Sequence, residues 1–184
     1  MPPQKWHVPL KEGQSGWPVL VAFDVALPEG THYPTNAELK LIFPSGNASL
    51  KTWGRGGNFA IHNQSTRPEY LVDDPHWLAI HRPLGLHTDP AYPRYSHQLL
   101  LRGEGLCILG KAEEEVEMGR GVFYILDGHS PHEVRRTDPN NDANWYVAAS
   151  VDSHAPLNGD DILPVLIDYA CTAQFLPDGV MPNG

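Results

Sequence analysis

The sequence predicts a single, mainly β domain, and the composition and the spacing of turn residues carry that prediction. The chain has 184 residues, which is the length of one domain. Its 17 glycines and 18 prolines make up about a fifth of the chain, against a usual ~12%, while charged residues fall to 19%. Short apolar or alternating runs recur between Gly, Pro, Asn and Asp residues. Such runs are typical of strands joined by tight turns in a sandwich or a barrel.

Nine of these runs are expected to form strands, because each is short and is bounded by turn residues. They cover residues 17–26, 37–43, 58–62, 77–81, 97–102, 106–109, 115–118, 122–126 and 145–151. The run at 37–43 also contains good helix formers, but its apolar side chains fall at every second position, which favours a strand.

One segment near the C-terminus, residues 161–175, has a helical period. Its apolar side chains recur at steps of three and four residues. We expect Asp160 or Asp161 as the N-cap, and Pro164 falls in the first turn, where proline is tolerated. This helix is expected to pack on the outside of the sheet. Residues 1–75 are expected to add N-terminal strands, with a second peripheral helix if 37–43 is helical.

The charge balance argues against nucleic-acid and membrane partners. Lys and Arg total 13 against 22 Asp and Glu, and the formal net charge of −9 repels phosphate groups. No run of ~18 apolar residues occurs, and the first residues lack the apolar stretch of a signal peptide. We therefore expect a soluble, cytoplasmic protein. Its two cysteines, Cys107 and Cys171, lie in apolar runs and are expected to be buried free thiols.

Two segments of this histidine-rich chain carry side chains suited to metal binding. His87 and Asp89 stand two residues apart, so in an extended segment both would point to the same face. His132 follows 45 residues after His87, which leaves room for about four short strands. That length of chain can cross a small barrel and return beside the first strand.

Two histidines and one carboxylate form the facial triad of non-haem iron sites, which leaves about half of the octahedral Fe(II) shell open. Co-substrate and oxygen would bind at the open positions. The sequence offers no set of thiolates of the kind that structural zinc requires. We therefore predict that His87, Asp89 and His132 are metal ligands, with a chance pairing in a chain of ten histidines as the alternative.

The segment between the two metal motifs reads as strand, glycine turn, strand, glycine turn, strand, over residues 97–127. This order predicts the inner part of a double-stranded β-helix, the jelly-roll of cupins. We expect residues 77–156 to form this core and to carry the metal site, within a single domain that spans residues 1–184.

This part of the chain resembles the aspartyl/asparaginyl β-hydroxylase-like branch of the Fe(II)- and 2-oxoglutarate-dependent oxygenases. The matching segments are Leu84-Gly85-Leu86-His87-Thr88-Asp89, Arg94-Tyr95-Ser96-His97-Gln98-Leu99, Gly121 through Asp127, His132-Glu133-Val134 and Ser150-Val151-Asp152. The resemblance implies Fe(II) as cofactor, 2-oxoglutarate and O2 as co-substrates, and hydroxylation of an amino-acid or peptidyl substrate. It also implies that Arg94 and His97 contact the 2-oxoglutarate carboxylate. No catalytic side chain beyond the metal ligands is predicted.

The chain departs from the family at one position. Family members usually place an arginine early in the last core strand, where its guanidinium forks onto the distal carboxylate of 2-oxoglutarate. Residues 141–147 contain no arginine, and Arg136 and Arg94 are the candidate substitutes.

Two other interpretations of the chain therefore stay open. One is a cupin metalloenzyme of another class that does not use 2-oxoglutarate, and the other is a non-catalytic β-barrel that binds a small ligand. His97 has its own alternatives, as a core histidine or as a fourth metal ligand.

Overall fold

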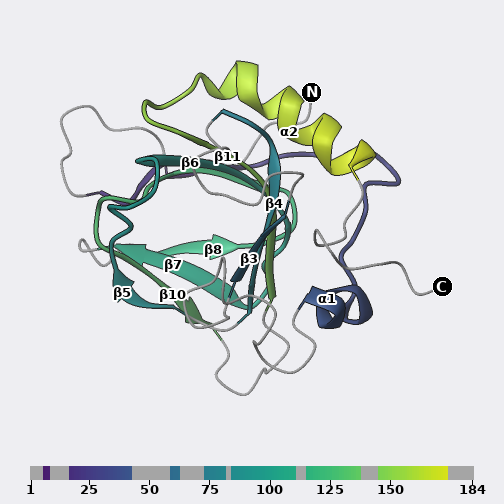
Figure 1. Cartoon of the computed structure of the whole chain (residues 1–184), viewed down its shortest axis with the longest axis horizontal. Helices are drawn as coiled ribbons and strands as arrows, with labels where there is room; N and C mark the ends of the chain where they lie inside the picture. The colour runs from purple at the N-terminus through teal and green to yellow at the C-terminus, as the bar shows by residue number, and fades with distance from the viewer. Residues whose placement is uncertain are drawn as a thin grey trace.

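The computed structural model describes residues 6–8, 17–42, 59–62, 73–81, 84–110, 115–137 and 145–173. Within these ranges the chain forms two antiparallel sheets and two helices, one of them near the C-terminus (Figure 1). The prediction of a mainly β chain is therefore confirmed. No helix in these ranges is long and apolar enough to cross a membrane.

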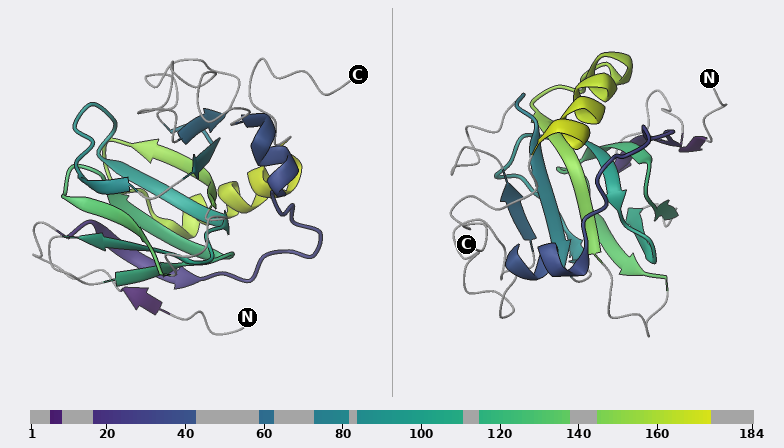
Figure 2. Two further views of the ribbon diagram at one scale, coloured as in Figure 1. Left: turned by 90° about the horizontal axis from the view of Figure 1, so that it is seen from below. Right: turned by 90° about the vertical axis from the view of Figure 1, so that its right-hand side faces the viewer.

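Among the described residues, the larger sheet has seven strands and the smaller sheet has four. Figure 2 shows the strands from two further directions. In spatial order, the larger sheet contains β1 (Trp6–Val8), β2 (Val19–Asp24), β9 (Val122–Asp127), β6 (Tyr95–Arg102), β11 (Trp145–Ser153), β4 (His76–His81) and β3 (Phe59–His62). The smaller sheet contains β5 (Leu84–His87), β10 (His132–Arg136), β7 (Leu106–Gly110) and β8 (Glu115–Met118). Eight of the nine predicted runs overlap one of these strands.

The ninth run is a helix, α1 (Asn36–Ile42), so the strand predicted at 37–43 is wrong. A capping box starts the helix: the backbone N–H of Thr35 donates to Glu38 Oε2 at 2.7 Å, and the N–H of Glu38 donates to Thr35 Oγ1 at 3.3 Å. Leu39 is fully buried in the core. The Thr-x-x-Glu spacing was the signal for a helix, and it outweighs the alternation of apolar residues.

The second helix, α2 (Gly159–Thr172), covers the outer face of the larger sheet, where it lies over β6 and β11 (Figure 1). It starts before the predicted residue 161, because Asn158 rather than Asp160 or Asp161 is the N-cap. The Asn158 side chain accepts a hydrogen bond from the N–H of Asp160 at 2.9 Å.

The central strands of the larger sheet are consequently buried on both faces. Leu99 and Val151 pack beneath α2, whereas Leu100 and Ala148 face the smaller sheet. Apolar side chains therefore occupy successive positions in these strands, and their sequences do not alternate between polar and apolar residues.

The cysteines differ from the prediction in one respect. Both are free thiols; Cys107 is buried in β7, and burial raises the pKa of its thiol. Cys171 is exposed, because it lies on a side of α2 that does not pack against the sheet.

The packing of α2 gives a direct test of the fold. Leu166→Ala removes a fully buried side chain from the helix–sheet contact and should lower the free energy of unfolding by about 2–5 kcal/mol. Val165→Ala, at an exposed position of the same helix, should change it by less than about 0.5 kcal/mol. Urea denaturation followed by circular dichroism measures both. Equal losses in the two variants would contradict the described orientation of α2.

Candidate metal centre

The two predicted histidine ligands come from neighbouring strands of the smaller sheet. β5 and β10 pair in antiparallel register, with His87 and His132 directly opposite each other. Side chains at opposite positions of an antiparallel pair share one face and lie close together. The two imidazole rings have centroids 4.3 Å apart and planes inclined by 56°. Strand pairing thus brings together two residues that are far apart in the sequence.

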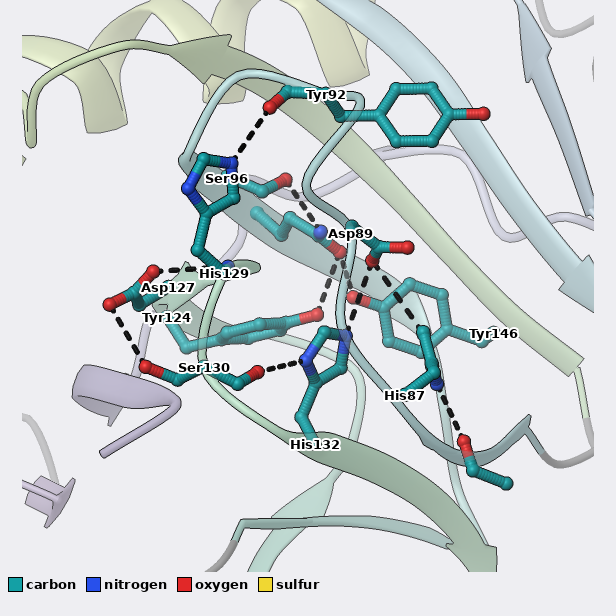
Figure 3. Close-up of polar contacts among 12 residues, drawn as sticks. His87, Asp89, Tyr92, Ser96, Tyr124, Asp127, His129, Ser130, His132 and Tyr146 are labelled. Atoms are coloured by element: carbon teal, nitrogen blue, oxygen red, sulfur yellow. Dashed lines mark hydrogen bonds and ion pairs between the residues drawn. The ribbon is translucent and has the colours of Figure 1, made fainter. Parts of the chain in front are cut away.

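Asp89 joins the histidines from the segment that follows β5 (Figure 3). Its backbone N–H donates to the Gly128 carbonyl at 2.7 Å, which fixes this segment against the turn before β10. The Asp89 Oδ2 atom lies 3.3 Å from His132 Nε2 and 3.6 Å from His87 Nε2. The expectation that one extended strand would carry His87 and Asp89 is therefore wrong in detail, since β5 ends at His87. A backbone hydrogen bond to the turn brings Asp89 to the same place.

Backbone carbonyls fix the orientation of both imidazoles. His87 Nδ1 donates to the Gly85 carbonyl at 2.5 Å, and His132 Nδ1 donates to the Ser130 carbonyl at 2.8 Å. A carbonyl can only accept, so in each neutral ring the proton is on Nδ1 and the lone pair is on Nε2. The two Nε2 lone pairs therefore face the carboxylate of Asp89. The distances of 3.3 and 3.6 Å exceed those of ordinary N–H···O hydrogen bonds.

Three acceptors gathered around one point suit a bound cation. One potential ligand atom from each of the three residues lies within 4.8 Å of the other two. Ligands held about 2.1 Å from a metal at right angles are about 3 Å apart, close to the two distances from Asp89. His132 is almost fully buried, whereas His87 and Asp89 are each roughly a quarter exposed. Their donor set and spacing fit a facial triad that is open on one side.

Asp127, at the end of β9, accepts hydrogen bonds that stabilise the turn before His132. Its carboxylate accepts hydrogen bonds from Arg94 Nε at 3.1 Å, from Arg94 Nη2 at 2.9 Å and from Ser130 Oγ at 3.0 Å. Burial alone would raise the pKa of Asp127, but the hydrogen bonds from Arg94 and Ser130 and the charge of Arg94 outweigh it and lower the pKa. Because the Ser130 carbonyl holds His132, Asp127 positions a candidate metal ligand. Sequence reasoning missed this role, which the Asp-x-x-Ser spacing of a turn could have indicated.

The triad lines a cavity of about 340 Å³ between the two sheets. Apolar side chains form much of its wall: Leu78, Ile80, Leu84, Ile108, Leu126 and Val134. A buried polar cluster also lines it, in which Gln98 Oε1 accepts hydrogen bonds from Tyr124 at 2.7 Å and from Tyr146 (Figure 3). Gln98 Nε2 donates to Ser96 Oγ at 2.7 Å. Burial, with a smaller effect of Asp152, raises the pKa of Tyr124 well above its usual value, so this hydroxyl stays neutral.

His97 does not reach this cavity. It lies on the face of β6 that packs beneath α2, beside Leu99 and Leu101. His97 Nδ1 donates to the Val151 carbonyl at 3.1 Å, and Nε2 accepts from the Leu157 N–H at 2.9 Å. Burial lowers its pKa, which keeps the ring neutral. Both nitrogens are used within the fold, so the expected contact with 2-oxoglutarate is not supported, and His97 is a core histidine.

The two candidate arginine anchors lie in different places. Arg94 lines the cavity; its side chain is 50% exposed, and it bonds Asp127 through Nε and Nη2. Arg136 is at the far end of β10, beside Leu106, and about 13 Å along the strand from His132. It is not among the residues that line the cavity. The structure therefore brings Arg94, and not Arg136, close to the metal centre.

The ligand set can be tested by metal binding. His132→Ala should weaken the binding of Fe(II), or of Co(II) as an oxygen-stable probe, by more than about 100-fold, because it removes the most buried ligand. His154→Ala, at an exposed position, should bind metal like the wild type. Anaerobic isothermal titration calorimetry measures the affinities. Wild-type affinity in His132→Ala would remove this residue from the ligand set.

The lowered pKa of Asp127 predicts a pH dependence of stability. The pKa of Asp127 is lower in the folded chain than its value of about 3.9 in the unfolded chain. The ionised carboxylate therefore makes its full contribution to stability above about pH 3.9, and this contribution is lost as the pH falls through the folded pKa. Asp127→Asn should therefore reduce the free energy of unfolding more at pH 7 than at pH 2. Urea denaturation at the two pH values measures the difference. If the free energies of unfolding of variant and wild type differ by the same amount at pH 7 and pH 2, the prediction is contradicted.

The chain matches no protein-family model, no curated protein and no solved structure. The interpretation of the site therefore depends on the donor chemistry and the geometry of its own residues.

Proposed function

We propose that the protein is a non-haem Fe(II) oxygenase whose metal is held by His87, Asp89 and His132. The observation that supports this most is the convergence of two imidazole Nε2 lone pairs and one carboxylate at the wall of a cavity. Two histidines and one carboxylate with open positions favour Fe(II) among the common metals. When bound, the iron would supply the activation of dioxygen for attack on a C–H bond.

The side chains of this chain would contribute position, charge and exclusion of water. The carbonyls of Gly85 and Ser130 hold both imidazoles with Nε2 toward the metal position. The carboxylate of Asp89 offsets part of the metal charge. The apolar wall lets a hydrocarbon group enter the cavity and displaces water from it. His87 and Asp89 remain partly exposed, so small molecules can approach from their side.

The strand order supports a more specific fold assignment, the double-stranded β-helix. Eight consecutive strands, β4 to β11, divide between the two sheets in the orders β4-β11-β6-β9 and β5-β10-β7-β8. In each sheet an early strand pairs with a late one, which is the arrangement of a jelly-roll built from two Greek keys. We propose this fold together with the kinship to the aspartyl/asparaginyl β-hydroxylase-like oxygenases.

We propose 2-oxoglutarate as the co-substrate, with Arg94 as the anchor of its distal carboxylate. Arg94 is the only Lys or Arg among the described residues that line the cavity. Its bonds to Asp127 use Nε and Nη2, and Nη1 has no hydrogen-bond partner in the described part of the chain. A guanidinium can donate to two carboxylates at once, because it has five N–H groups. An amino-acid or peptidyl substrate is part of the same proposal.

A second candidate is a metal-dependent dioxygenase that does not use 2-oxoglutarate. The bidentate bond between Arg94 and Asp127 favours it, since Arg94, the one Lys or Arg among the described residues that line the cavity, already has a carboxylate partner. The metal site would be the same in both cases. The two candidates differ only in whether the cavity binds a dicarboxylate.

Spectroscopic titration separates the candidates. Anaerobic addition of Fe(II) followed by 2-oxoglutarate should give a weak visible charge-transfer band if the co-substrate chelates the iron. Iron binding without that band would favour the second candidate. If the wild-type chain binds no iron, the protein is not an iron oxygenase and the proposal fails.

Variants of the two arginines refine this test. Arg94→Ala should weaken the binding of 2-oxoglutarate by at least about 10-fold, because a charge-assisted hydrogen bond to its carboxylate is lost. Arg135→Ala serves as control, since this side chain is exposed and pairs with Glu133. Arg94→Ala also frees Asp127, so the loss of 2-oxoglutarate affinity must exceed the loss of Fe(II) affinity. Equal losses of both would mean that Arg94 only supports the metal turn.

A further inference from the structure

The cavity contains a second histidine–carboxylate pair, His76 and Asp152, which the metal site does not use. His76 begins β4 and Asp152 lies near the end of β11, the strand with which β4 pairs. Both side chains line the cavity; His76 is 1% exposed and Asp152 is 17% exposed. His76 Nε2 lies 3.6 Å from Asp152 Oδ2, a distance longer than a hydrogen bond. The two side chains are therefore neighbours without a direct hydrogen bond between them.

The proton on His76 can be placed from its other contact. His76 Nδ1 lies 3.2 Å from the carbonyl of Asp74, which can only accept, so Nδ1 carries the hydrogen. In the neutral ring, Nε2 then has a lone pair that faces the carboxylate of Asp152. Two acceptors face each other, and a donor placed between them would satisfy both. A ligand N–H group that reaches this part of the cavity can donate to both acceptors, so the gap favours a ligand that donates hydrogen bonds.

The neighbouring polar groups also offer acceptors. Tyr124 and Tyr146 both donate their hydroxyl hydrogens to Gln98 Oε1, so their oxygens present lone pairs. The negative charge of Asp152 acts on Tyr124, because it helps to raise the pKa of that hydroxyl. This part of the cavity therefore repels anions. A metal ion is also disfavoured, since the one described group of three or more metal-ligating side chains is the His87, Asp89 and His132 triad.

We propose that Asp152 and His76 form a subsite for a protonated amine. An alkylammonium group carries a positive charge at pH 7 and has N–H donors for both the carboxylate and Nε2. The apolar side chains of the same cavity would cover the hydrocarbon part of the ligand. Binding of an amine does not depend on the proposed function. If that function holds, the subsite assigns an amine-bearing molecule as the substrate class.

Binding of simple probes tests the subsite without any reaction. Pentylamine, pentan-1-ol and pentanoate share one chain length and differ in the end group. They would be titrated into the full chain in the presence of a chelator, because amines also coordinate metals. We expect pentylamine to bind at least about 10-fold more tightly than pentan-1-ol, whereas pentanoate, whose carboxylate suits the proposed anchor Arg94 in the same cavity, should bind independently of Asp152. Calorimetry or NMR shifts report the affinities. Equal binding of amine and alcohol would overturn the proposal.

Two variants locate the binding. Asp152→Asn should abolish the preference for pentylamine while leaving pentan-1-ol binding unchanged, which also shows that the cavity is intact. Asp168→Asn, the same change at an exposed position on α2, should keep the full preference. If Asp152→Asn does not fold, His76→Phe keeps a ring of similar size and should reduce the preference severalfold. Full preference for the amine in whichever of the two variants folds would refute the subsite.

The test is independent of the metal proposal. Amine binding in chelator requires no iron, so its failure leaves the iron site standing. Failure of iron binding, in turn, leaves an amine-binding cavity.

Discussion

The antiparallel pairing of β5 with β10 is the constraint on which the candidate site depends. It places His87 opposite His132, and the turn before β10 supplies the carbonyls that hold His132 and the backbone of Asp89. A shift of this register by one residue would turn one imidazole to the other face of the sheet. The convergence of the three candidate ligands therefore depends on strand register as much as on residue type.

The environment of the cavity follows from the two layers around it. α2 covers one face of the larger sheet and the smaller sheet covers the other, so the side chains of β4, β6 and β11 divide between a core and a cavity. Polar residues on the cavity side, such as Gln98 and Asp152, are held among apolar ones. In such surroundings each unpaired acceptor or charge has a large effect on which ligand can enter.

Part of this arrangement could be predicted from the sequence. The glycines and prolines between apolar runs predicted the positions of most strands. The His-x-Asp spacing with a distant histidine predicted three residues whose side chains lie close together. The sequence does not predict which face of β6 lines the cavity, because both faces are buried, so it could not decide between a co-substrate contact and a core position for His97. At residues 37–43 the alternation of apolar side chains favoured a strand over the helical alternative, but the capping box outweighs that alternation and the segment is a helix. The local bond between Ser130 and Asp127 follows an Asp-x-x-Ser turn pattern, but the bond from Arg94 joins residues far apart in the sequence and no local pattern predicts it.

The proposed metal centre and the proposed amine subsite would give the cavity two chemically distinct positions, one for a cation held by two histidines and Asp89 and one for a hydrogen-bond donor facing Asp152. An anomalous difference map at the iron edge, from crystals grown anaerobically with Fe(II), tests the first most directly. The account predicts one strong peak within bonding distance of His87 Nε2, His132 Nε2 and a carboxylate oxygen of Asp89. A peak bound by other residues, or none at these three, would contradict it.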